Sequence, residues 1–550
     1  MKKLLTYSCS LLSAGALYAE TVWLGTVEVS SLQSLQTGIE AFCKAADIPL
    51  PPDAIKDVMK DFPEEVLEVP NLDIAAVSDK DPIRLFLVVD SEERYPDPAF
   101  VVEMTLTADA KAIELPEGMA LAIKAGNKAV LTTSKEAAAW YQKQDNKLDA
   151  FLPMAGTQTV KGCFNLKQVM KLIGEDFPPM PGGEANPAIA MLKDFEYLSF
   201  ALTPAAQALT VSYGLRLKEG TLLANLLNAV TPPQAPLWNG LPENALFAYV
   251  GQQSFQEDAV KIVKAYLGQD IPLDPNHAKL EQTYTRDLIR YLALTADKKA
   301  FRIIDVNPLK DAAAVTVAKE LIKTLDQAGA ETGMGFKKEP SREAGQVTLE
   351  RYSLNVDPAA IMRMQGIDPA MLAPGGGNAG MAPFMAVLSA LTKGIVMECA
   401  IKDNYFFSAI GPADATDDWI PALPFAAPTV TLDKKVGGLD PAAKPLLAAG
   451  ELQITPFLKQ LISMMPNVKP EHLALFDAKT DTVQFWTTRT ADNTTIATFR
   501  VPANEVASIA KVAQNGQILQ ELVTTFFMTR MMPMMRGQPG GPAIQPPPNF

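Results

Sequence analysis

The sequence has little histidine: His277 and His472 are the only two in 550 residues. Neither stands in a metal-binding spacing such as His-x-x-x-His, and neither has a Ser or Cys nearby in a recognisable nucleophile elbow. Each follows a proline in a stretch that we expect to be a loop. The nucleophile-elbow, zinc-protease, calcium-loop and dinucleotide-binding motifs are also missing. The sequence therefore indicates no catalytic residue, no metal ligand and no cofactor-binding residue.

Positive charge is scarce as well. Lys and Arg together number 49 against 62 Asp and Glu, so the formal net charge is −13, and no basic stripe stands out. Phosphate contacts from Lys and Arg supply much of the affinity for nucleic acid, and the same residues attract proteins to anionic lipid. We therefore expect this chain to bind neither nucleic acid nor anionic lipid through charge.

Cysteine is rare. Beyond the first segment of the chain only Cys43, Cys163 and Cys399 remain. Three is an odd number, so at least one thiol is free or pairs with another chain. Each stands in an apolar stretch expected to be helix or strand, which favours small buried hydrophobes over a disulfide. Their wide separation excludes a local Cys-x-x-Cys redox or zinc pattern.

Several short patterns suggest chemistry but lack their companions. Ser508 and Lys511 have the Ser-x-x-Lys spacing of penicillin-interacting serine enzymes, yet no Lys-Thr-Gly or Ser-Asp-Asn accompanies them. Three glycines at 375–377 precede no Gly-Lys-Ser/Thr and are expected to form a loop rather than a phosphate cradle. Adjacent acids such as Glu64 and Glu65 are typical of a solvated turn. Paired glycosidase carboxylates need a defined gap that sequence cannot show.

A cluster of methionines near the C-terminus allows two interpretations. Thioethers of exported Met-rich segments can bind Cu(I), and an apolar helix end can pack on the protein body or a partner. The second is favoured because no His or Cys accompanies the cluster, which comprises Met528, Met531, Met532, Met534 and Met535.

The first residues have the pattern of an export signal. Lys2 and Lys3 precede an apolar run, and Ala16-Leu17-Tyr18-Ala19 fits a small-residue cleavage site before Glu20. We therefore expect a signal peptide over residues 1–19, cleaved after Ala19. The mature protein is then periplasmic or secreted and has no transmembrane span.

The rest of the chain alternates between strand-like and helix-like periods, which predicts an α+β fold of antiparallel hairpins packed by short amphipathic helices. The stretch from Tyr291 to Val306 reads as a hairpin with its turn after Thr295, and we expect the stretch around Thr107 to be its counterpart. Leu198, Phe200 and Leu202 form the apolar phase of another hairpin. Ser254-x-x-Glu257 has the pattern of a capping box.

Five short markers recur in one order in the two parts of the chain, which favours an internal duplication. One pair is Ile123-Lys124 with Ile401-Lys402, and another is Leu166-Lys167-Gln168 with Leu458-Lys459-Gln460. The expected divisions are a first half, a Pro-rich linker, a second half with an insert at about 307–393, a Met-rich helix and a disordered Pro/Gly-rich tail, at 20–230, 231–244, 245–512, 513–536 and 537–550.

These observations favour an exported, non-catalytic envelope protein. We expect it to bind a partner protein or an apolar ligand along an open sheet face or in a cleft between the halves. Two alternatives stay open. One is an extracytoplasmic hydrolase with an unrecognised site, and the other is a structural component that self-associates through the Met-rich helix. The sequence does not determine the oligomeric state.

Overall fold

The computed structural model describes residues 21–514 with internal gaps. The described ranges, apart from a few isolated positions between them, are 21–49, 77–89, 98–107, 119–123, 127–144, 158–173, 187–233, 245–268, 275–295, 300–325, 334–345, 347–356, 394–414, 446–463, 468–474, 481–490 and 493–514. The signal peptide, the glycine run at 375–377, the methionine cluster and the C-terminal tail predicted above lie outside the described residues.

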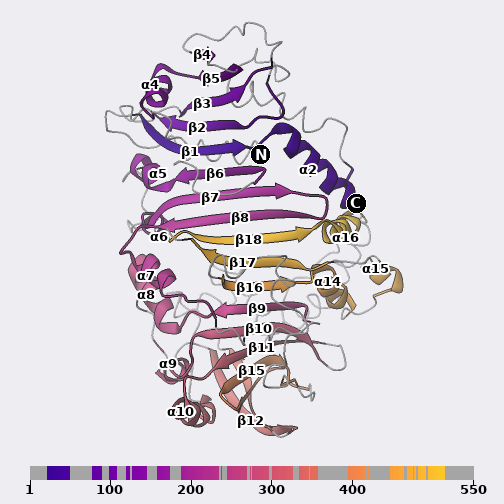
Figure 1. Cartoon of the computed structure of the whole chain (residues 1–550). Coiled ribbons are helices and arrows are strands. Elements are labelled where there is room, and N and C mark those ends of the chain that lie inside the picture. Colours follow the sequence, from indigo (N-terminus) through magenta and orange to yellow (C-terminus); the bar gives the residue numbers. More distant parts are fainter. Residues whose placement is uncertain are drawn as a thin grey trace, which may run out of the picture.

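All described strands belong to one open sheet of 18 strands, and each adjacent pair is antiparallel (Figure 1). From the first edge the order is β4 (Ala120–Ile123), β5 (Lys128–Thr132), β3 (Pro98–Thr105), β2 (Ile83–Val89), β1 (Val22–Val29), β6 (Val160–Asn165), β7 (Phe195–Pro204) and β8 (Ala208–Leu217). It continues with β18 (Thr495–Pro502), β17 (Val483–Arg489), β16 (Leu446–Leu452), β9 (Phe247–Gln252), β10 (Asp287–Leu294), β11 (Phe301–Pro308), β15 (Tyr405–Pro412), β14 (Ile395–Lys402), β13 (Val347–Val356) and β12 (Met334–Ala344). The predicted sheet-rich α+β class with antiparallel hairpins is confirmed.

Polar residues at positive φ form three of the hairpin turns. Asn127 lies between β4 and β5 at φ 62°, Asp403 between β14 and β15 at 52°, and Asn493 between β17 and β18 at 62°. Asn and Asp tolerate this left-handed conformation better than other residues with a side chain.

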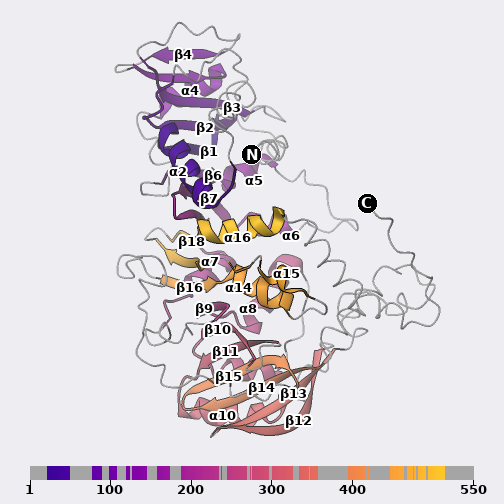
Figure 2. The same ribbon diagram turned by 90° about the vertical axis from the view of Figure 1, so that its right-hand side faces the viewer.

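Helices gather at the two ends of the strands. At one end lie α2 (Leu32–Ala45), α14 (Ile454–Ser463), α15 (Pro470–Ala474) and α16 (Ala503–Gln514), and Figure 2 shows α14 and α16 side by side. The other helices are α4 (Lys135–Lys143), α5 (Leu166–Ile173), α6 (Pro187–Leu192), α7 (Leu222–Asn228), α8 (Gln256–Leu267), α9 (Pro275–Glu281) and α10 (Ala312–Ile322). No described helix crosses the middle of β7, β8, β18 and β17 in Figure 1. None of the described helices has the length and apolar character needed to cross a membrane.

Side-chain caps begin several helices. Ser31, Ser134, Thr221 and Asp311 each accept a hydrogen bond from the backbone amide three residues on, which satisfies an amide that the helix leaves unpaired. The predicted capping box at Ser254 and Glu257 is wrong by one residue. The N-cap of α8 is Phe255, and the Asp258 carboxylate accepts from the Phe255 amide at 3.2 Å.

Two further expectations are wrong. Thr295 follows β10 inside the β10–β11 turn, whereas Thr107 lies beyond the second strand of its hairpin, so the two are not counterparts. The histidines are in helices rather than loops, with His277 in α9 and His472 in α15. The insert contains the helix α10 and the two strands β12 and β13, and the many charged residues of β12 obscure its strand character in the sequence.

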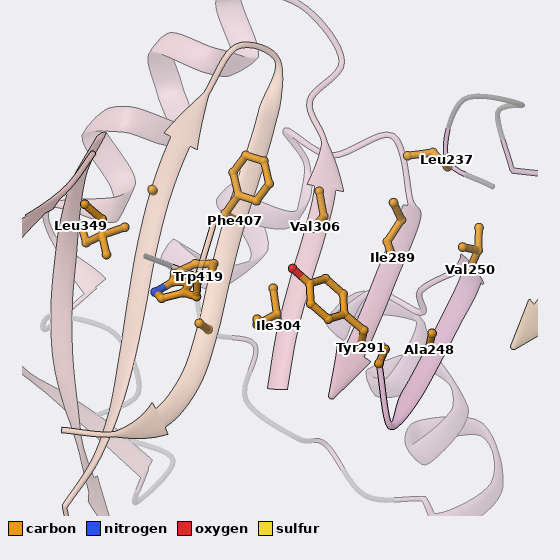
Figure 3. Close-up of a cluster of buried hydrophobic side chains, with 14 residues drawn as sticks. Leu237, Ala248, Val250, Ile289, Tyr291, Ile304, Val306, Leu349, Phe407 and Trp419 are labelled. Carbon is orange, nitrogen blue, oxygen red and sulfur yellow. The ribbon is translucent and has the colours of Figure 1, made fainter. Parts of the chain in front are cut away.

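The largest described core lies on one side of the second part of the sheet. Tyr291, Ile304, Val306 and Phe407 project from neighbouring strands into this cluster, and Trp419 packs with them (Figure 3). Directly opposed residues of an antiparallel pair share a face, so strand pairing extends this face across the whole sheet. It is called the inner face below. The opposite face is called the outer face.

Both sheet edges are protected from pairing with another chain. The edge strand β4 has only 4 residues. The other edge strand, β12, carries Lys337, Lys338 and Pro340, and its register shifts between Glu339 and Arg342. Short length, charge, proline and irregular register are recognised ways to prevent edge-to-edge pairing.

The first and second parts of the chain meet within the sheet at β8 and β18, which pair over eight positions from Thr495–Leu215 to Pro502–Ala208. Ser212 and Thr498 face each other there, and their hydroxyls are 3.0 Å apart. Arg489 at the end of β17 adds a second contact, because its guanidinium donates to the carbonyls of Leu227 and of Val230 at the end of α7.

Candidate interaction surface

The outer face carries a row of aromatic side chains across the middle of the sheet. Phe200 on β7 is directly opposite Tyr213 on β8, and Phe499 on β18 is opposite Phe485 on β17. Pairing places all members on the outer face. The row, called the aromatic stripe below, consists of Phe164, Phe200, Tyr213, Phe499, Phe485, Tyr249 and Phe247.

Six of the seven rings of the stripe form two stacked groups. Phe164 and Phe200 have centroids 5.9 Å apart. Phe485 lies 6.3 Å from Phe499, 6.1 Å from Phe247 and 6.4 Å from Tyr249, with small angles between the ring planes. Such offset contacts are favourable beyond the area they bury. The stripe is thus a fixed arrangement of rings.

Three glycines make room for these rings. Gly25, Gly162 and Gly450 are the cross-strand partners of Phe164, Phe200 and Phe485, respectively. A Cβ atom on any of the three would overlap the ring of its partner. Each ring therefore lies flat over the neighbouring strand, which keeps the stripe low and continuous.

The stripe is open to solvent. Tyr213 is 51% exposed and Phe499 is 41% exposed, and the other rings are half-buried. The apolar row continues from Phe247 through Leu292 to Ile303 and Ile410, which are directly opposite each other and 46% and 44% exposed. Leu292, Ile303 and Ile410 are called the aliphatic extension.

The burial of these strands is the reverse of the usual pattern. An antiparallel sheet normally packs its apolar phase on the core. On β7 the inner-face residues Ser199 and Ala201 are 1% and 3% exposed, while Phe200 between them is only half-buried. Across the seam Thr498 is 7% exposed and its neighbour Phe499 is open. Small side chains are buried, and large apolar ones are presented outward.

Charge is nearly absent from the stripe. The nearest described ion pair on the outer face joins Arg290 and Asp305 on β10 and β11, with two N–O distances of 2.7 Å. Burial raises the pKa of the Tyr249 phenol, so it stays neutral at physiological pH. The surface is thus apolar and uncharged on a strongly acidic protein.

The residues singled out from the sequence do not assemble into a reactive site. Ser508 is 1% exposed, and its hydroxyl donates to the Asn504 carbonyl at 3.0 Å, while Lys511 is exposed. His277 is half exposed and its Nδ1 is 3.6 Å from Glu281. Within the described ranges, no group of three or more His, Cys, Asp or Glu side chains could hold a metal ion.

The cysteines have the surroundings expected of small hydrophobes. Cys163 and Cys399 are fully buried, Cys43 is half-buried, and all three are free thiols. Burial raises the pKa of Cys163 to about 12, and burial also raises the pKa values of Cys43 and Cys399. Thiols of this kind are unreactive at neutral pH.

Sequence reasoning missed the stripe, although its pieces were visible. The alternation of Leu198, Phe200 and Leu202 correctly indicated a strand, but it did not show that this apolar phase faces solvent. The signal that could have shown otherwise is the small size of the intervening Ser199 and Ala201 together with glycines on nearby strands.

No known family model, no curated protein and no solved structure matches this chain.

Proposed function

We propose that this chain is a non-catalytic binding protein that presents the aromatic stripe to a protein partner. One observation carries the proposal: the apolar phase of the central strands is open while the small polar phase is buried. Contiguous exposed apolar patches are uncommon on monomeric proteins and typically mark interaction sites. Four of the exposed large hydrophobic residues, Tyr213, Phe499, Ile303 and Ile410, lie along this one row.

The shape of the stripe favours a macromolecule over a small apolar ligand. Small ligands bind in concave sites that enclose most of their surface. The stripe and its extension run over ten neighbouring strands, so at a spacing of about 4.8 Å they are about 43 Å long. Three cavities on the molecule have linings that include none of the seven stripe rings. A partner with an extended apolar surface fits this geometry.

The partner is expected on the face of the sheet rather than at an edge. Strand addition needs an exposed edge with regular unpaired backbone groups. The shortness of β4 and the proline and register shift of β12 work against it. A cleft between the halves is also disfavoured, because the eight-position pairing of β8 with β18 joins them edge to edge.

We further propose that the two parts of the chain are related halves. Counted outward from the β8–β18 seam, hairpins and helices follow in the same order on both sides. Gly162 with Phe200 and Gly450 with Phe485 occupy matching places. Stepping from each matched residue to its partner on the next strand gives further matches. They are Val27 with Tyr249, Leu85 with Arg290, Val102 with Asp305, Leu131 with Ser408, and Leu121 with Cys399. Leu121 and Cys399 each lie two residues before a marker found in the sequence, Ile123-Lys124 and Ile401-Lys402.

Export is also part of the proposal and is supported by the pattern of residues 1–19. Mass spectrometry of the protein purified from its native host should find a mature chain that begins at Glu20. A mature chain that still begins at Met1 would contradict it.

Photo-crosslinking tests the binding function. A benzophenone amino acid replaces Tyr213 or Phe499 in the full chain within its native cells, and Val317 and Leu267, which are exposed apolar residues on α10 and α8 away from the stripe, are the matched controls. We expect discrete crosslinked protein species from positions 213 and 499 only. Equal crosslinking at the control positions, or none at the stripe, would contradict the proposed function.

A further inference from the structure

The centre of the aromatic stripe is arranged symmetrically about the seam between β8 and β18. Read across the strands, its order is Gly162, Phe200, Tyr213, then Phe499, Phe485, Gly450. On each side of the seam, two aromatic residues lie next to the seam and a glycine lies beyond them.

A local twofold axis relates the two sides. Ser212 and Thr498 are opposed at the seam, and Tyr213 and Phe499 each follow by one residue. Because β8 and β18 are antiparallel, rotation by a half-turn about an axis normal to the sheet exchanges the two strands. It brings Tyr213 to the place of Phe499 and Phe200 to the place of Phe485.

We propose that the partner is a second copy of this chain, packed outer face to outer face through the stripe. The inference rests on the proposed function and names its partner. Closed twofold assembly is the commonest state of homo-oligomers, and it requires a self-complementary surface. A stripe that reads the same in both directions offers equivalent ring contacts to both halves of a second copy. An asymmetric partner would use the two equivalent sides differently.

The size of the stripe is adequate for such a contact. Along the strands, the stripe is about 18 Å wide, because its rings lie at positions up to two residues apart and their side chains extend beyond these positions. Across the strands, the six central strands span about 24 Å. These dimensions give about 430 Å² per copy, which rises to about 770 Å² when the aliphatic extension takes part, against about 800 Å² per partner in an ordinary stable interface. We therefore expect a reversible dimer in the micromolar range.

Charge supports the same arrangement. Two copies with a net charge of −13 each repel one another, and association is favourable only where the facing surfaces carry no net charge. The stripe meets this condition, because its rings are neutral and the Arg290–Asp305 pair beside it is internally balanced. Sheets packed face to face lie about 10 Å apart, a distance that aromatic side chains fill.

Sedimentation equilibrium on the full-length mature protein tests the proposal. One double variant has Tyr213→Glu and Phe499→Glu, and the other has Tyr213→Lys and Phe499→Lys. Each should be monomeric, because equal charges then face each other in either orientation of the dimer. An equimolar mixture of the two should restore a dimer, because Glu then faces Lys. Val317→Glu should leave the wild-type dimer unchanged, and circular dichroism should show that all variants fold.

The outcomes separate this inference from the proposed function. A wild-type protein that is monomeric at every concentration overturns self-association, whereas the proposed function still stands if positions 213 and 499 crosslink to a different protein. A dimer that persists in both double variants places the contact elsewhere and also overturns the inference. Loss of dimer only on truncation after Gln514 would assign the contact to the C-terminal segment instead.

Discussion

Glu398 on β14 is a buried carboxylate held among positive charges in the second part of the sheet. It is 1% exposed, and its carboxylate is surrounded by Arg302, Arg342, Arg351 and Trp419, with the Arg351 Nε 3.1 Å from Oε1. Arg342 donates to both oxygens at 2.7 Å, Trp419 donates to Oε2 at 2.6 Å, and Arg302 lies 3.3 Å from Oε2. Arg302 is itself 1% exposed, so its charge has little access to water.

The predicted perturbation is Glu398→Gln, which keeps the size of the side chain and removes its charge. One carboxylate oxygen becomes an amide group that cannot accept from Arg342 or Trp419, and buried guanidinium charge loses its counterion. Breaking a buried ion pair in this way costs roughly 3–5 kcal/mol. The side chains of Arg342 and Arg351 are 15% and 19% exposed and can relax toward solvent. We therefore expect a cost at the lower end of this range, about 3 kcal/mol.

The assay is urea unfolding followed by tryptophan fluorescence, supplemented by amide hydrogen exchange in β14, since a chain of this length can unfold in stages. Glu343→Gln on the exposed part of β12 is the matched control and should change the free energy of unfolding by less than about 0.5 kcal/mol. A loss of less than about 1 kcal/mol for Glu398→Gln would refute the reasoning, because it would mean that the arginines do not depend on this carboxylate.

The pH dependence provides a second check. Burial raises the pKa of Glu398, but hydrogen bonds from Arg342 and Trp419 and the charges of Arg342 and Arg302 outweigh it and hold the pKa below its ordinary value of 4.5. A carboxylate with a lowered folded-state pKa stabilises the protein above its unfolded pKa and loses that contribution as the pH falls through the folded value. The difference between wild type and Glu398→Gln should therefore be full at neutral pH and shrink well below pH 4.5. A constant difference would contradict the assignment.

Three further predictions concern the packing of the sheet. Gly162→Ala and Gly450→Ala should each destabilise the protein by about 1–3 kcal/mol, because the new methyl group displaces a stripe ring; unchanged melting temperatures would show that the rings do not lie over the glycines. Arg489→Ala should cost about 1–3 kcal/mol, because carbonyls at the end of α7 lose their donor, and amide exchange in α7 should rise; equal exchange would contradict the contact. Cys163 and Cys399 should resist a thiol reagent in the native state and react on unfolding, and rapid native reaction would contradict their burial.

Hairpin turns and helix starts are the features that local chemistry determines, although the capping box expected at Ser254 lies one residue before the actual N-cap of α8. The β14–β15 turn at Asp403 and the caps at Ser31 and Thr221 depend on residues within a few positions of one another. The strand β12 was missed because its Lys, Glu, Pro and Arg residues belong to an edge, where charge protects rather than disrupts the sheet. Polarity alone does not distinguish such an edge strand from a loop.

The candidate surface could not be predicted because it depends on which strands are neighbours. Phe499 and Tyr213 are far apart in the sequence, and only the pairing of β18 with β8 brings them onto one patch. Alternation along a strand shows that two faces differ, but it does not show which face is covered. That choice depends on where the helices pack. Here α4 covers part of the inner face near β4 and α10 covers part of the outer face near β14, while no described helix crosses the middle of the central strands in Figure 1.

The β12–β13 hairpin has a consequence for how such a sheet can grow. It pairs with β14 through four positions, from Glu350–Cys399 to Ser353–Val396, and its Arg342 and Arg351 also contact Glu398 on β14. Without it the terminal strand would be β14, whose sequence Ile-Val-Met-Glu-Cys-Ala-Ile-Lys is largely apolar. The charged β12–β13 hairpin therefore enlarges the sheet. It also replaces an apolar edge strand, which is prone to pair with another chain, with an edge strand that resists such pairing.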